Sequence, residues 1–200
     1  MAEKIVFQSD DFQIEGVLDR RTSDSGVVVS HPHPLYGGDM HAAGVESIVH
    51  AYRNKGYTTL KFNFRGVGNS QGRHDSGIGE QQDVISAISY LGDIGMKTVD
   101  LAGYSFGAWV NFHAVQQNTA TARMIMVSPP VGFMDFKNTS PIDCLKLVVS
   151  GSRDEIAPPE RIEKMLPAWS KDAHFEIIEG ADHFYGGYFD RLETILATHL

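Results

Sequence analysis

Residues 99–107 read Val99-Asp100-Leu101-Ala102-Gly103-Tyr104-Ser105-Phe106-Gly107, and a helix-like run from Ala108 to Gln117 follows directly. The first part is typical of a short buried strand, and the second part is a Gly-x-Ser-x-Gly turn. Such a sharp turn strains the backbone of its serine, and it needs glycine at 103 and 107 so that strand and helix can approach closely. The stretch therefore predicts a nucleophilic Ser105 whose Oγ is exposed above the edge of a sheet. The alternative is a glycine-rich loop whose serine has no catalytic role.

Two backbone amides are candidates for stabilising a negatively charged oxygen. The turn places the amide of Phe106 at a helix N-terminus, where it has no intrahelical acceptor and can donate to a developing oxyanion. A second donor is expected from the segment His31-Pro32-His33-Pro34-Leu35-Tyr36-Gly37-Gly38, which follows a predicted strand at 26–30. Proline has no amide hydrogen, so the rigid turn would present Leu35 or Tyr36 instead, and we predict Leu35 as the donor. A purely structural turn is the alternative.

Strand-like and helix-like patterns alternate along most of the chain. The predicted strands are 5–8, 12–18, 26–30, 57–64, a stretch from Lys97 into the serine turn, 123–127, 145–149 and 175–178. The predicted helices are 41–55, one whose buried stripe is Val84, Ile88 and Leu91, then 108–117, 161–166 and one from Phe189 to Leu196. This alternation predicts an α/β fold with a mainly parallel sheet and helices on both faces, the opening strands forming an antiparallel edge.

Length and composition limit the classes of function. The 200 residues, 42% of them apolar and 21% charged, suffice for one domain over residues 1–200 with a sizeable core. The net charge of −8 argues against nucleic acid or an anionic membrane as partner. No apolar run reaches the roughly 20 residues of a membrane span, and the N-terminus lacks the features of a signal peptide. We therefore expect a cytoplasmic protein.

Neither cysteine nor histidine usage indicates a metal or another cofactor. Cys144 is the single cysteine, so an intrachain disulfide is excluded, and its apolar surroundings predict a small buried side chain. His31 and His33 form the densest histidine pair, but no third ligand stands at a recognisable spacing. We expect no metal and no cofactor.

Two further loops carry groups that would complete the chemistry of a nucleophilic serine. Asp154 lies just after the predicted strand 145–149, where it could orient an imidazole or, as readily, cap the following helix. His183 lies just after the predicted strand 175–178. The carboxyl ends of parallel strands meet at one edge of a sheet, so these loops should lie beside Ser105. Asp182 is a rival for Asp154, but neighbours in an extended loop tend to point apart, and we predict Asp154.

The chain order Ser, Asp, His completes a resemblance. Four motifs carry it: His-Pro-His-Pro-Leu-Tyr-Gly-Gly at 31–38, Phe-Arg-Gly-Val-Gly-Asn-Ser at 64–70, Gly-Tyr-Ser-Phe-Gly at 103–107, and the loops of Asp154 and His183. The chain resembles the α/β-hydrolase superfamily, and within it the dienelactone hydrolase-like group, over almost its full length. The resemblance implies a three-layer fold with about seven to eight strands and no lid domain, because the link between Val127 and Leu145 is too short for one.

The resemblance also implies roles for particular residues. Ser105 would be the nucleophile, His183 its base and Asp154 the partner of the base, with Phe106 and Leu35 as oxyanion amides. Dienelactone hydrolase itself uses cysteine as nucleophile, so the serine here disfavours that particular substrate. Four residues are candidates for the pocket, each equally open to a packing role: His33, Tyr36, Phe133 and Tyr185. Arg65 is expected to brace loops rather than to bind substrate.

These features predict a serine hydrolase that cleaves a carboxylic ester of a small acyl group through an acyl-enzyme. A thioesterase, a hydrolase of small amides or peptides, and a catalytically silent binding module remain alternatives. The expected partner is a small-molecule acyl substrate, and a homodimer in which a partner subunit covers the site is left open.

Overall fold

In the computed structural model, which describes residues 2–117, 119–137 and 140–200, eight strands form one sheet. Their order across the sheet is β1-β2-β4-β3-β5-β6-β7-β8. β1 and β2 pair antiparallel, β2 pairs antiparallel with β4, and the remaining pairs are parallel. The strands are β1 (Ala2–Ser9), β2 (Phe12–Asp19), β3 (Ser25–Ser30), β4 (Thr58–Phe62), β5 (Thr98–Tyr104), β6 (Arg123–Val127), β7 (Leu145–Gly151) and β8 (His174–Ile178). The predicted parallel sheet with an antiparallel edge is confirmed.

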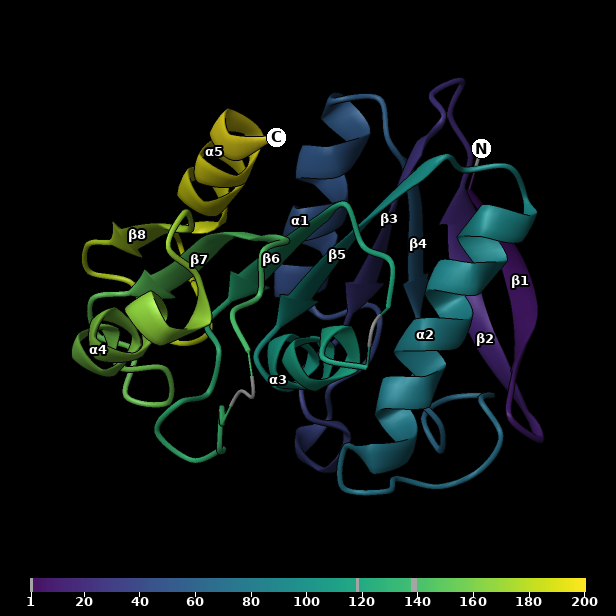
Figure 1. Cartoon of the computed structure of the whole chain (residues 1–200), viewed down its shortest axis with the longest axis horizontal. Helices are drawn as coiled ribbons and strands as arrows, with labels where there is room; N and C mark the ends of the chain where they lie inside the picture. The colour runs from purple at the N-terminus through teal and green to yellow at the C-terminus, as the bar shows by residue number, and fades with distance from the viewer. Residues whose placement is uncertain (1, 118, 138–139) are drawn as a thin grey trace.

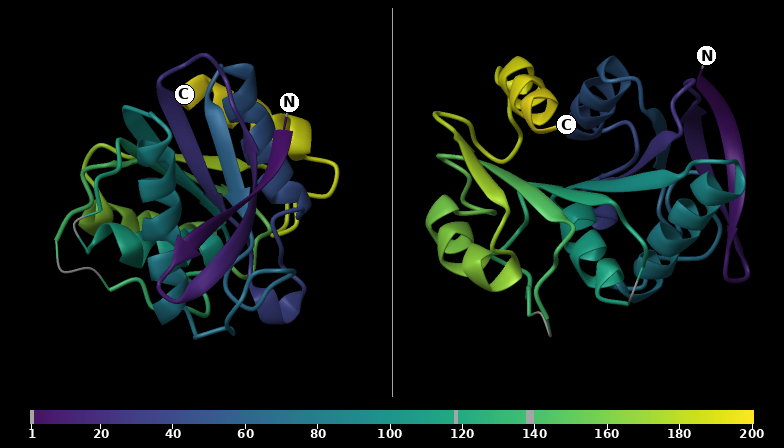
Figure 2. Two further views of the ribbon diagram at one scale, coloured as in Figure 1. Left: turned by 90° about the vertical axis from the view of Figure 1, so that its right-hand side faces the viewer. Right: turned by 45° about the horizontal axis from the view of Figure 1, so that its top comes forward.

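Helices cover both faces of the sheet and give the molecule three layers (Figure 1). α1 (Ala43–Asn54) and α5 (Phe189–His199) lie side by side on one face. α2 (Ile78–Asp93), α3 (Phe106–Val115) and α4 (Pro159–Trp169) lie on the other (Figure 2, right). A short 3-10 helix, η1 (Pro34–Tyr36), follows β3. Among the described residues, no helix combines the length and the apolar composition that crossing a membrane requires.

Each face of the sheet has its own apolar core because the central strands are buried on both sides. In β3, Val28 packs with the residues of α2 and α3, whereas Val27 and Val29 pack with those of α1. The three valines have no exposed surface. A continuous apolar run of this kind is what a strand sandwiched between two helical layers requires.

The main differences from the predicted elements lie at their ends and have local causes. The strand predicted over 57–64 spans Thr58–Phe62. The Asn63 amide still donates to Glu15 O on β2, whereas the Phe64 amide leaves the sheet and donates to His31 Nε2. α4 continues past Pro167, which it accommodates in its last turn. The η1 helix was not predicted, because two prolines in four residues give no periodicity.

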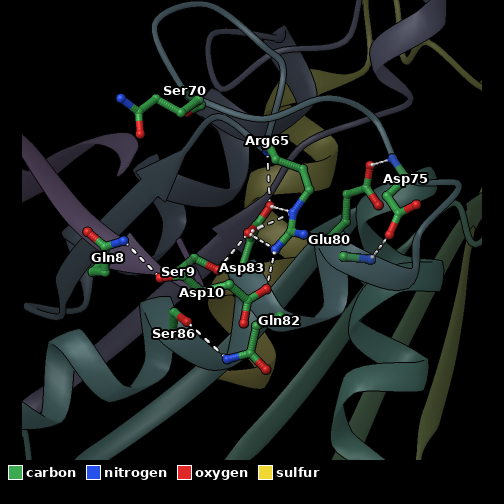
Figure 3. Close-up of polar contacts among 12 residues, drawn as sticks. Gln8, Ser9, Asp10, Arg65, Ser70, Asp75, Glu80, Gln82, Asp83 and Ser86 are labelled. Carbon is green, nitrogen blue, oxygen red and sulfur yellow. Dashed lines mark hydrogen bonds and ion pairs between the residues drawn. The ribbon is translucent and has the colours of Figure 1, made fainter. Parts of the chain in front are cut away.

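A buried ionic network fixes the loop that follows β4. Arg65 donates to both carboxylate oxygens of Asp83 on α2 and, at 3.1 Å, to Asp10 in the β1–β2 turn, and Ser9 donates to Asp83 at 2.7 Å. Figure 3 shows the guanidinium pointing onto these carboxylates. Asp83 is fully buried, so each ionic partner offsets the desolvation of the others. Arg65 ties three segments together, as its expected bracing role requires.

Candidate active site

Ser105 occupies the turn between β5 and α3 with φ 55° and ψ −118°. A positive φ is uncommon for a residue with a side chain and is typical of strain at a functional site. The flanking glycines are needed: a Cβ on Gly103 would lie 2.6 Å from the Ala108 amide nitrogen, and one on Gly107 would lie 2.4 Å from the Ser30 carbonyl oxygen. Strand and helix can meet at this angle only without those carbons, as the sequence predicted.

The side chains of Ser105, His183 and Asp154 are hydrogen-bonded in series. His183 Nε2 lies 2.9 Å from Ser105 Oγ, and His183 Nδ1 lies 2.9 Å from Asp154 Oδ2 and 3.0 Å from Oδ1. The three groups come from the loops after β5, β8 and β7, and they are between 2% and 7% exposed. The structure thus brings together the three side chains that the sequence singled out.

Backbone contacts hold the histidine and the carboxylate in place. Tyr104 donates its hydroxyl to the His183 carbonyl oxygen at 2.7 Å. Asp154 Oδ1 accepts the amides of Ile156 and Ala157 at 3.0 and 2.7 Å. Asp154 therefore closes its own loop as well as contacting the imidazole, but it does not cap α4, whose N-cap position is Pro158 and which has no side-chain cap.

The environment of Asp154 favours its ionised form. Burial alone would raise the pKa of this carboxyl, but hydrogen bonds and charge from His183, together with the Ala157 amide and the Ser128 hydroxyl, hold its pKa below the ordinary value. Asp182 is exposed, and its Oδ1 accepts the amide of Phe184 at 3.0 Å. The carboxylate in contact with His183 is that of Asp154.

The sequence did not single out Ser128, and of its two alternatives for Tyr185 the packing role applies. Ser128 follows β6, and its Oγ lies 2.7 Å from Asp154 Oδ2 and 2.7 Å from the Tyr185 hydroxyl. Tyr185 is fully buried behind the carboxylate, so it does not line a pocket that substrate enters from solvent. The position of Ser128, just after the strand between β5 and β7, was the available signal.

The amide predicted as second oxyanion donor is already engaged. Leu35 N donates to His33 Nδ1 at 3.2 Å, and Tyr36 N donates to His33 O at 3.1 Å. The rigid turn directs both amides back into itself, so the assignment of Leu35 is not supported. The amide of His33, between the two prolines, has no acceptor among the described residues, and the His33 ring lies 4.6 Å from that of Phe106.

The other pocket candidates lie at the rim of the site. Tyr36 is 89% and Phe133 78% exposed, so neither encloses a cavity. His33 is half-buried and packs against Phe106 and His74, a residue that the sequence did not single out. Burial and the neighbouring His74 lower the pKa of His33, which keeps its imidazole neutral and able to accept the Leu35 amide.

The ring nitrogens of His31 both serve the fold. Nε2 accepts the Phe64 amide at 3.0 Å, and Nδ1 lies 2.6 Å from the Pro32 carbonyl oxygen, to which it donates. Burial lowers the pKa of His31 to about 4, which keeps the ring neutral as these bonds require. Within the described ranges, no three His, Cys, Asp or Glu side chains gather closely enough to hold a metal ion.

Comparisons with known proteins identify the fold and the family of the chain. No family model matches the chain. An uncharacterized protein of Rickettsia prowazekii (strain Madrid E) is 32% identical over 194 residues, which cover 91% of this chain and 82% of the relative. The structure of an α/β serine hydrolase homologue from Coxiella burnetii matches with a TM-score of 0.92 at 32% identity, covering 99% of this chain and 97% of the other. An α/β serine hydrolase without a lid from Xanthomonas campestris matches with a TM-score of 0.92 at 27% identity, covering 99% and 93%.

The relative from Coxiella burnetii exceeds 30% identity over nearly the whole of both chains, and its TM-score of 0.92 shows that the two chains share one fold. The chain therefore belongs to the α/β-hydrolase superfamily, as a small member without a lid.

Proposed function

We propose that the protein is a serine hydrolase that cleaves a carboxylic ester of a small acyl group through an acyl-enzyme formed on Ser105. The observation that carries this proposal is the continuous series of contacts from Ser105 Oγ through the His183 ring to Asp154, with both links at 2.9 Å. A serine needs an adjacent base to become a nucleophile at neutral pH, and the base needs a third group to orient it.

The hydrogen bonds assign the protons. An ionised Asp154 carboxylate can only accept, so the proton of neutral His183 resides on Nδ1, and Nε2 presents its lone pair to Ser105. During attack on the ester carbonyl, His183 takes the hydroxyl proton of Ser105 and then delivers it to the leaving alcohol. Water activated by the same histidine hydrolyses the acyl-enzyme, and Asp154 stabilises the imidazolium in both steps.

The tetrahedral intermediate needs two amide donors for its oxyanion. Phe106 supplies one, because it is the first residue of α3 and its amide therefore has no acceptor within the helix. We assign the second to the amide of His33 in place of Leu35. This choice is supported by the contact between the rings of His33 and Phe106 and by the unpaired amide of His33 within the described part of the chain.

The exposed apolar side chains around Ser105 favour a substrate with a small acyl group. A lid would supply a second apolar wall, and the large apolar side chains near the site, Leu35, Tyr36, Phe133 and Phe184, are 69% or more exposed. Long acyl chains would gain little burial against such a surface. Thioesters and small amides share the same acyl chemistry and are therefore the relevant competitors.

The test is labelling of the protein with a fluorophosphonate, followed by turnover of matched esters, thioesters and amides of short acyl chain length. We expect stoichiometric labelling of Ser105, with esters turned over fastest. The matched control is Ser105→Ala, which should lose labelling and at least about 10⁴-fold in kcat while unfolding at the wild-type temperature. A protein that is not labelled would be a silent binding module, and a variant that kept a tenth of the wild-type rate would show that Ser105 is not the nucleophile.

A further inference from the structure

Beyond the three residues of the proposed mechanism, two buried hydroxyl groups stand in line with Asp154. Ser128 Oγ lies 2.7 Å from Asp154 Oδ2 on one side and 2.7 Å from the Tyr185 hydroxyl on the other. Ser128 and Tyr185 have no exposed surface. They come from the segments after β6 and β8, and both have positive φ, at 47° and 56°. Ser128 and Tyr185, which form one hydrogen bond with each other, are thus both held in strained backbone conformations.

The direction of each hydrogen bond follows from the inventory of donors. The ionised Asp154 carboxylate has no hydrogen to donate and accepts from three other groups, the amides of Ile156 and Ala157 and the His183 ring, so Ser128 must use its single hydroxyl hydrogen to donate to Oδ2. Ser128 Oγ is then an acceptor toward Tyr185, whose hydroxyl is the donor. Burial raises the pKa of Tyr185 far above its ordinary value, so this phenol keeps its proton at every working pH. The relay therefore runs one way, from Tyr185 through Ser128 to Asp154.

We propose that Ser128 and Tyr185 are positioning residues for the hydrolase reaction: their relay fixes the Asp154 carboxylate and keeps it ionised against His183. The proposal rests on the proposed function of the Ser105, His183 and Asp154 series. Without the relay, Oδ2 would face a low-dielectric interior with one donor fewer, and the carboxylate would bind a proton more readily and rotate more freely.

The other titratable groups around Asp154 and His183 do not replace the relay. The Tyr104 ring, from β5, stacks 5.7 Å from His183, but its hydroxyl is committed to the backbone carbonyl of His183. Asp182, from the loop after β8, is exposed and bonded to the Phe184 amide. Each of these groups is a neighbour of the pair, and neither donates to the carboxylate of Asp154.

The test is a titration of the Asp154 carboxyl by ¹³C NMR in the wild type, Ser128→Ala, Tyr185→Phe and Tyr104→Phe, with the signal assigned by its absence in Asp154→Asn. We expect the carboxyl pKa of Asp154 to rise by about one unit in Ser128→Ala and by a smaller amount in Tyr185→Phe. Tyr104→Phe is the matched control, because it removes a buried hydroxyl that donates to the His183 carbonyl oxygen and not to Asp154, and it should leave this pKa unchanged. In parallel, kcat should fall on the order of tenfold to a hundredfold in Ser128→Ala with KM nearly unchanged.

The titration needs no turnover, so it separates this proposal from the proposed function. An unchanged Asp154 pKa in both relay variants, or an equal rise in Tyr104→Phe, would overturn the relay whatever the enzyme hydrolyses. If Ser128→Ala does not fold, Tyr185→Phe alone decides, because it removes one oxygen atom and keeps the ring that packs in the core. A raised Asp154 pKa in a protein without esterase activity would support the relay and reject the substrate class.

Discussion

The imidazole of His33 accepts the backbone amide of Leu35 at 3.2 Å, while the ring itself lies 4.6 Å from that of Phe106. The Leu35 amide is thus occupied by the side chain of His33. The backbone amide of His33 itself has no hydrogen-bond acceptor among the described residues. One residue decides which amide of the loop is left to bind an oxyanion.

This relationship gives a backbone test. His33 has φ −61°, which matches the angle fixed by proline, so His33→Pro removes the amide hydrogen without a change in the chain path. We expect kcat to fall about 10²- to 10³-fold relative to His33→Ala, which also lacks the imidazole but retains the amide. Equal rates in the two variants, measured on the same activated ester, would show that this amide is not the donor.

Two substitutions test which aspartate is the partner of His183. Asp154→Asn should lower kcat by about 10⁴-fold, because an amide oriented toward His183 favours the wrong imidazole tautomer. Asp182→Asn alters an exposed carboxylate that contacts the Phe184 amide, and it should retain most of the activity. Steady-state kinetics of the two purified variants give the ranking, and the opposite ranking would transfer the role to Asp182.

Far from Ser105, near the start of β5, a buried carboxyl makes stability depend on pH. Burial raises the pKa of Asp100 to about 6, although Arg123 acts against the rise. For an acid with a raised folded pKa, the stabilising contribution is present below its unfolded pKa and is lost as the pH rises through about 6. Asp100→Asn should therefore stabilise the protein at pH 7.5 relative to pH 4.5, by on the order of 1–3 kcal/mol. Urea unfolding at both pH values measures this difference, and a pH-independent effect would contradict it.

The exposed apolar rim predicts how activity depends on acyl length. Each methylene that becomes buried contributes about 0.8 kcal/mol, but methylenes beyond a short chain would stay in water at this site. The ratio kcat/KM for p-nitrophenyl esters should stop rising early along the series from acetate to palmitate, with no jump where the substrate forms micelles. A steady rise to palmitate would mean that another surface, such as a second subunit, covers the rim.

The sequence determined most of the sheet and the three side chains of the Ser105, His183 and Asp154 series, because each follows from a local pattern. Gly-x-Ser-x-Gly specifies the turn of Ser105 by itself, and parallel strands bring the loops of Asp154 and His183 to the same edge. That the Leu35 amide is engaged could not be predicted, because it depends on where the His33 imidazole points, which composition does not encode. The contact between Ser128 and Tyr185 could not be predicted for a similar reason: a hydrogen bond across 57 positions of the chain becomes visible only when the loops are packed.

His183 is carried by the loop after β8, and β8 is the last strand at its end of the sheet, paired with β7 alone. Outer strands with one neighbour open locally at a lower free energy than the whole domain unfolds. Each such opening would carry the imidazole away from Ser105 while α1, α2 and the central strands stay folded. We therefore expect the proposed enzyme to lose activity at elevated temperature through fraying of this edge before the domain unfolds, and a strengthened β7–β8 pair to prolong activity without any change at Ser105.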